Sequence, residues 1–90
     1  MDLKELRKEI DAVDQELVAL FERRMEISEK FAAFKEEKGI PVRDEVREKE
    51  KIRQVQDMTH TAFCRQHIEE LYNLLISLSR KRQEELVKKS

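Results

Sequence analysis

The residue that most clearly suggests chemistry is Arg24, because it interrupts an otherwise apolar helical stripe. Apolar side chains recur in steps of three and four on both sides of it, at Leu3, Leu6, Ile10, Val13, Leu17, Leu20, Ile27, Phe31 and Phe34. Arg24 occupies the position where this rhythm requires another apolar residue. A charge on a buried stripe is costly unless an opposite charge meets it there. The pattern therefore predicts an anion held inside a helical bundle.

Lys35 falls on the same side of this helix as Arg24. The two are eleven residues apart, and eleven steps of about 100° leave them only about 20° apart around the axis. Their long side chains could therefore reach one small ligand. Arg7 precedes Arg24 by seventeen residues, which corresponds to about 260° of rotation and about 25 Å along the axis. If Arg7 is functional, it must reach a site made mainly by another subunit.

Two later segments also place polar side chains on single helix faces. Asp44, Arg47 and Glu48 fall on one face within little more than one turn, and Ser79 and Gln83 are four residues apart. Taken singly, Asp44 and Glu48, like Arg7 and Lys35, would be ordinary solvated charges in most charge-rich helices. Ser79 and Gln83 would likewise fit helix-face polar residues without a function. Even an arginine on an apolar seam can set register or pair with a neighbouring glutamate.

The elements that must position these residues are three helices: long, short and long. Neither Gly nor Pro occurs from Leu3 to Lys38, Asp2 is suited to cap the first turn, and Gly39 is suited to end the helix. A second helix is predicted from about Asp44 to Met58, with Val46, Ile52, Val55 and Met58 as its apolar set. A third is predicted from about Ala62 to Val87. The boundary near 58–61 has no strong helix breaker. The predicted fold class is all-α.

The first helix is too long for one compact chain of this size. Its length is roughly 54 Å at 1.5 Å per residue, whereas a compact chain of 90 residues has a diameter near 30 Å. The apolar stripe runs along the whole helix. We therefore expect a second copy to cover the overhang and form a homodimer.

The composition favours charge-rich helices. Residues 1–90 are expected to form a single domain, with 43% charged and 39% hydrophobic residues. The net charge of −1 argues against a nucleic-acid binder, and we interpret Arg80-Lys81-Arg82 as a solvated helix face. The lone Cys64 favours a reducing compartment. No signal peptide, membrane span or metal-ligand spacing is recognisable, so a cytoplasmic protein without membrane partner or metal is expected.

Taken together, the chain resembles the all-helical chorismate mutases, in which the helices of two subunits intertwine. The resemblance lies in an ordered set of residues over nearly the full length: Leu6-Arg7, Ile10-Asp11, Asp14, Arg23-Arg24, Lys35, Pro41-Val42-Arg43-Asp44, Arg47-Glu48, Ser79 and Gln83. It implies an intertwined homodimer that rearranges chorismate to prephenate, a shikimate-pathway step in phenylalanine and tyrosine biosynthesis. It implies neither cofactor nor metal.

The resemblance also implies roles by position. Catalysis would fall to Lys35, Glu48 and Gln83. Substrate binding would fall to Arg7 of the partner subunit and to Arg24, Asp44, Arg47 and Ser79. Arginines suit the two carboxylates of chorismate, whereas Asp44 and Glu48 would accept from its hydroxyl or hold the cationic side chains in place. Lys35 and Gln83 would donate to the ether oxygen as its bond breaks.

Two other functions fit parts of the same pattern. A related lyase on this scaffold splits isochorismate into salicylate and pyruvate, although Val42-Arg43-Asp44 before Arg47-Glu48 looks more like the mutase. A non-enzymatic dimeric helical module would explain the apolar rhythm equally well. It would not explain why all three helices contribute inward polar groups. So short a chain leaves little room for an effector domain, and we expect no feedback control.

Overall fold

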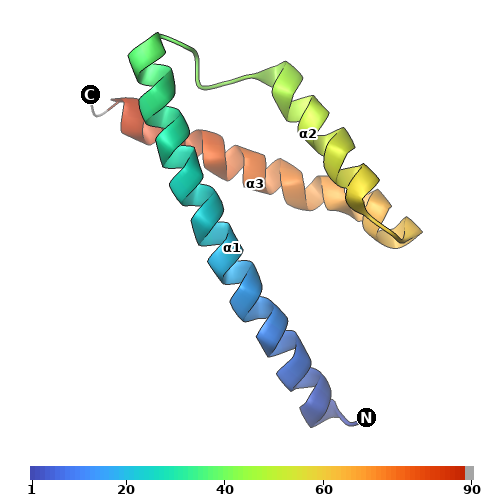
Figure 1. Ribbon diagram of the computed structural model, residues 1–90. Coiled ribbons are helices and arrows are strands. Elements are labelled where there is room, and N and C mark those ends of the chain that lie inside the picture. Colours follow the sequence, from blue (N-terminus) through green and yellow to red (C-terminus); the bar gives the residue numbers. More distant parts are fainter. Residues whose placement is uncertain (89–90) are drawn as a thin grey trace.

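A computed structural model describes residues 1–88, which form three helices (Figure 1). Helix α1 spans Leu3–Lys38, α2 spans Glu45–Met58 and α3 spans Ala62–Lys88. The described residues contain no strand. The all-α class and the long, short, long order are confirmed, and the helix ends agree with prediction to within one residue.

The first helix begins and ends at the predicted caps, Asp2 and Gly39. The Asp2 carboxylate accepts from the backbone N–H of Glu5 at 2.8 Å. Gly39 adopts a left-handed conformation with φ of 66°, which a residue without Cβ takes up at no steric cost. At the weakly marked boundary, the hydroxyl of Thr61 accepts from the backbone N–H of Cys64 at 3.1 Å and caps α3.

The helices are arranged in an open, extended shape (Figure 1). Helix α3 packs against both other helices, whereas the backbones of α1 and α2 do not approach each other within the described chain. The N-terminal half of α1 extends away from the rest. The chain measures 54 × 25 × 14 Å, and its radius of gyration of 16.3 Å exceeds the roughly 12 Å of a compact chain of this length. The predicted overhang of α1 is therefore confirmed.

Little apolar surface is buried within one chain. Among the described residues only Ala32 and Val55 are buried hydrophobic side chains. Of the apolar set expected on the second helix, Val46 and Met58 are largely exposed. The stripe of α1 is exposed as well, at Leu3, Leu6, Ile10, Val13, Leu17, Leu20, Ile27, Phe31 and Phe34. One chain thus leaves most of its apolar face uncovered.

The hydropathy of the helices bears on a membrane location. Within residues 1–88, no helix is both long enough and apolar enough to span a bilayer.

Candidate active site

One pocket of about 350 Å³ lies where the three helices approach one another. Its volume is within the range of small-molecule sites. All three helices and the loop before α2 contribute side chains to it: Arg24, Ile27, Ser28, Phe31, Lys35, Val42, Asp44, Arg47, Glu48, Lys51, Ile76, Ser79, Arg80 and Gln83. The pocket therefore draws on parts of the chain that are far apart in sequence.

The structure brings seven of the eight predicted site residues to this pocket. They are Arg24, Lys35, Asp44, Arg47, Glu48, Ser79 and Gln83. Arg7 does not line it and is exposed on the overhanging half of α1. Within a single chain Arg7 and Arg24 thus serve different regions, as the helical geometry predicts.

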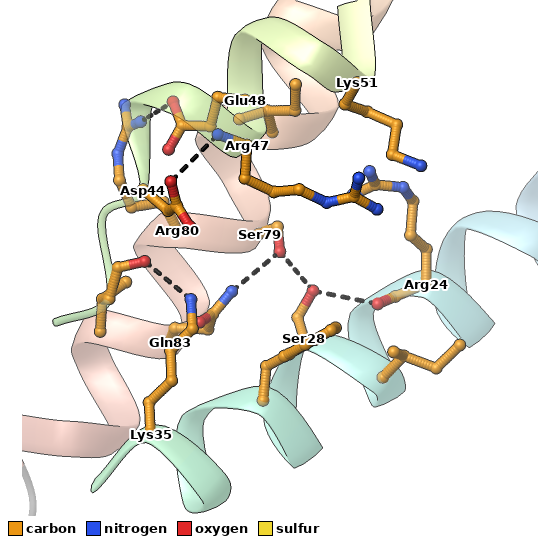
Figure 2. A pocket seen from close by; sticks show the side chains of 14 residues that line it. Arg24, Ser28, Lys35, Asp44, Arg47, Glu48, Lys51, Ser79, Arg80 and Gln83 are labelled. Atoms are coloured by element: carbon orange, nitrogen blue, oxygen red, sulfur yellow. Dashed lines mark hydrogen bonds and ion pairs between the residues drawn. The ribbon is translucent and has the colours of Figure 1, made fainter. Parts of the chain in front are cut away.

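A chain of hydrogen bonds crosses the contact between α1 and α3 (Figure 2). Gln83 Nε2 donates to Ser79 Oγ at 3.2 Å, the hydroxyls of Ser79 and Ser28 are hydrogen-bonded, and Ser28 Oγ donates to the carbonyl of Arg24 at 3.0 Å. Because Ser28 uses its proton on that carbonyl, Ser79 must be the donor to Ser28. Ser28 and Gln83 are only 3% and 6% exposed. This network links the pocket-lining residues of α1 to those of α3 and so fixes their relative positions.

Gln83 has unused hydrogen-bonding capacity. Its Oε1 is buried and has no hydrogen-bond partner in the described structure. A side-chain amide also carries two N–H groups, and only one of them is used on Ser79. A buried amide left partly unpaired is costly. It is thus prepared to bind a polar ligand.

Lys35 ties the loop before α2 to the end of α1. Its Nζ donates to the carbonyl of Val42 at 2.8 Å and lies 5.7 Å from the centre of the Phe31 ring. An ammonium group has three N–H donors. The bond to Val42 therefore holds the group at the pocket edge and leaves donors for a ligand.

Asp44 begins α2. One of its carboxylate oxygens accepts from the backbone N–H of Arg47 at 3.0 Å, as expected of an N-cap. This bond fixes the first turn of α2, from which Arg47 and Glu48 enter the pocket. The positive end of the helix dipole lies at the same place. Asp44 therefore has at least a local structural role beside any contact with substrate.

The pocket carries an excess of positive charge. Arg24, Lys35, Arg47, Lys51 and Arg80 face only two carboxylates, those of Asp44 and Glu48, so three positive charges remain. The side chains of Arg24, Arg47 and Lys51 point toward one another on one side of the pocket (Figure 2).

The charges on that side have little compensation from the protein itself. Arg24 and Lys51 form no ion pair with a carboxylate of residues 1–88, and Arg24 rests on the Tyr72 ring at 5.6 Å from its centre. Arg47 has only a distant, exposed pairing with Glu50 at 3.8 Å. Such convergence of like charges favours an anionic ligand.

Sequence reasoning missed three polar residues of the pocket, namely Ser28, Lys51 and Arg80. Each lies three or four residues from a predicted site residue: Ser28 follows Arg24, Lys51 follows Arg47, and Arg80 precedes Gln83. Residues at this spacing share a helix face. Helical neighbourhood to the predicted residues was therefore the signal that could have found them.

The prediction for Arg80-Lys81-Arg82 was partly wrong. Lys81 is exposed, as expected of a solvated face. Arg80 instead donates to Glu48 Oε1 at 2.8 Å within the pocket, and Arg82 donates to Glu29 Oε2 at 3.2 Å. Helix packing thus converts two of these three cations into links between helices.

Comparison with known proteins identifies one family. The family model described as chorismate mutase type II matches residues 6–84. No curated protein and no solved structure matches the chain. The matched range contains every pocket-lining residue and Arg7.

Proposed function

Because the chain belongs to the chorismate mutase type II family, we propose that it catalyses the intramolecular [3,3] rearrangement of chorismate to prephenate. The product would serve phenylalanine and tyrosine biosynthesis. Chorismate is a dianion with a ring carboxylate, an enolpyruvyl carboxylate and a ring hydroxyl. The pocket must therefore hold two negative charges and one neutral polar group.

The observation that carries this proposal is the set of uncompensated cations in the pocket. Arg24, Arg47 and Lys51 converge there, and Arg24 and Lys51 form no ion pair within the described chain. A planar guanidinium binds a carboxylate through two parallel hydrogen bonds. Two arginines and a lysine suit a compact dicarboxylate, which would also repay the cost of holding like charges together.

Catalysis in this proposal comes from restraint and electrostatics. The rearrangement is concerted, so it needs no nucleophile and no group to accept a proton. The cations would hold the enolpyruvyl arm over the ring, which converts a flexible reactant into a near-attack conformer. Lys35 and Gln83 would donate to the ether oxygen as its bond breaks and charge develops there. Both residues retain N–H donors beyond the bonds they make to Val42 and Ser79.

Glu48 and Asp44 have different parts in this proposal. The Glu48 carboxylate would accept a hydrogen bond from the ring hydroxyl, since this hydroxyl is the only O–H donor of the dianion. Asp44 caps α2 and so sets the position of Arg47 and Glu48. Its second carboxylate oxygen remains available for the hydroxyl or for a neighbouring cation.

The proposed active form is an intertwined homodimer. The apolar stripe of α1 is exposed along its length in one chain, and burial against a second copy would stabilise it by about 25 cal/mol per Å² of apolar area. In that dimer Arg7 of one subunit would reach the pocket of the other and contact a substrate carboxylate. The overhang of α1 supports this arrangement, since it carries Arg7 away from its own pocket.

The direct test is an assay of purified protein with chorismate, without added metal or cofactor. Loss of chorismate absorbance with prephenate as the product is the expected result. Salicylate and pyruvate formed from isochorismate, with chorismate untouched, would replace the proposal with the related lyase. Inactivity toward both compounds would leave a dimeric helical module and overturn an enzymatic role.

A further inference from the structure

The Arg80–Glu48 pair differs from the other ion pairs of residues 1–88. Arg80 Nη1 lies 2.8 Å from Glu48 Oε1, and the two side chains are only 26% and 25% exposed. The pairs Arg43–Glu45, Arg47–Glu50, Arg65–Asp57, His67–Glu70, Arg82–Glu29 and Arg82–Glu85 are longer and more exposed. A short, half-buried, charge-assisted hydrogen bond is stronger and more directional than an exposed pair. This one links α2 to α3 at the pocket wall.

The pair sits apart from the uncompensated cations. In Figure 2, the ends of the Arg80 and Glu48 side chains lie on one side of the pocket, and the charged ends of Arg24, Arg47 and Lys51 lie on the other. Glu48 has no other ion-pair partner in the described chain. Without Arg80, its carboxylate would be free to turn toward the other cations of the pocket, which include Arg47 and Lys51 on the same helix. Arg80 therefore keeps the acceptor and the anion-binding cations separate.

The two carboxylate oxygens of Glu48 are used differently. Oε1 accepts from Arg80, whereas Oε2 carries no hydrogen bond to the described residues. The backbone of α2 packs against α3 and does not approach that of α1, so the orientation of α2 over the pocket depends chiefly on α3. A bond from α3 to the first turn of α2 fixes both the helix and the carboxylate. The free oxygen is thus held in one direction.

From this geometry we propose that Arg80 is a positioning residue that holds Glu48 as the acceptor for the substrate's ring hydroxyl. The inference rests on the proposed mutase function and adds a residue to it. Arg80 acts through Glu48 and does not itself bind a substrate carboxylate. It also neutralises Glu48, so that this carboxylate repels the dianion less.

A double-mutant cycle tests this coupling. The variants are Arg80→Leu, Glu48→Gln and the double variant, each assayed for kcat/KM with chorismate. Arg82→Leu is the matched control, because Arg82 pairs with Glu29 across α3 and α1 and does not line the pocket. Circular dichroism and the melting temperature of each variant at equal protomer concentration report on folding.

We expect Arg80 and Glu48 to contribute to kcat/KM through one shared interaction. Arg80→Leu lowers kcat/KM by about 10- to 100-fold, the range for a lost hydrogen bond to a charged group, and Arg82→Leu lowers it by less than about threefold. The double variant is no slower than Glu48→Gln alone. Arg80→Lys, which retains a charged donor, restores part of the rate.

Three results would overturn the inference. The first is that Arg80→Leu lowers kcat/KM no more than Arg82→Leu does. The second is that the losses of kcat/KM caused by Arg80→Leu and Glu48→Gln multiply fully in the double variant. The third is that Arg80→Lys restores none of the rate. Full multiplication would instead mean that Arg80 binds the substrate directly. Should Arg80→Leu unfold, Arg80→Gln takes its place in the same cycle under the same criteria. Inactive wild-type protein would refute the mutase function itself, whereas active wild-type protein with an unimpaired Arg80 variant refutes only this inference.

Discussion

Ser28 of α1 and Ser79 of α3 are joined hydroxyl to hydroxyl where the two helices pack, 51 residues apart in sequence. The Ser28 hydroxyl donates a hydrogen bond to the carbonyl of Arg24, so the Ser79 hydroxyl must donate to Ser28. A substrate carboxylate that accepts from Ser79 must therefore turn this hydroxyl. The pair connects packing between helices with substrate binding.

The Ser28→Ala substitution tests that connection. It removes the acceptor of the Ser79 proton at a site that is 3% exposed, so we expect the free energy of unfolding to fall by about 1 kcal/mol. Activity should change by less than about threefold, because the Ser79 hydroxyl is released to face the ligand. Urea unfolding at fixed protomer concentration and chorismate turnover measure the two effects. A large loss of activity without loss of stability would assign Ser28 a direct role in binding.

The Gln83→Glu substitution tests the donor proposed for the ether oxygen. A carboxyl group can donate there only when protonated, so kcat/KM of this variant should rise as pH falls. Above the pKa of the introduced carboxyl, the rise should approach tenfold per pH unit. Wild-type protein, whose amide does not titrate, is the control over the same pH range. An identical pH profile for both proteins would count against Gln83 as the donor.

The Arg7→Ala substitution tests the shared site through subunit complementation. Arg7→Ala and Arg24→Leu proteins should each be nearly inactive, but a mixed dimer has one site with both defects and one intact site. Random exchange of subunits then restores roughly a quarter of the wild-type activity, since half of the dimers are mixed and half of their sites are intact. If the activity of the mixture after subunit exchange is only the sum of the activities of the two variants, Arg7 does not act across the interface.

The Lys51→Met substitution tests the third member of the cation cluster. Loss of one charge from a dianion site should raise KM by about 3- to 10-fold, with a smaller effect on kcat, and should weaken the dependence of KM on salt. Lys49→Met on the same helix is the control, because Lys49 does not line this pocket. Equal effects of the two substitutions would indicate a general field effect instead of a contact.

The fold was largely predictable from sequence because its signals are local. The apolar period of α1 and the break at Gly39-Ile40-Pro41 set the helix lengths, and Asp2 and Asp44 cap as their side-chain chemistry favours. The start of α3 was marked more weakly. Its cap is the Thr61 hydroxyl, a common residue type whose capping role depends on the backbone around it.

The main residues of the site were predicted from the sequence. Residues whose role depends on packing between helices were not. Arg24 stood out because a charge breaks an apolar stripe, a feature visible within one helix. Arg80 looked like part of a solvated basic cluster, and its partner Glu48 is 32 residues away. Only the contact between α2 and α3 makes that pair. Helical periodicity could place Arg80 on the face of Gln83, but its partner on another helix follows only from tertiary structure.

The rate of prephenate formation by the wild-type protein and by Arg24→Leu, measured side by side, shows whether Arg24 binds the substrate. We expect conversion by the wild type and a loss on the order of 100-fold or more in the variant. The melting temperature of the variant should be equal or higher, because leucine restores the apolar stripe. An Arg24→Leu protein as active as the wild type would mean that Arg24 does not bind the substrate and has only a structural role.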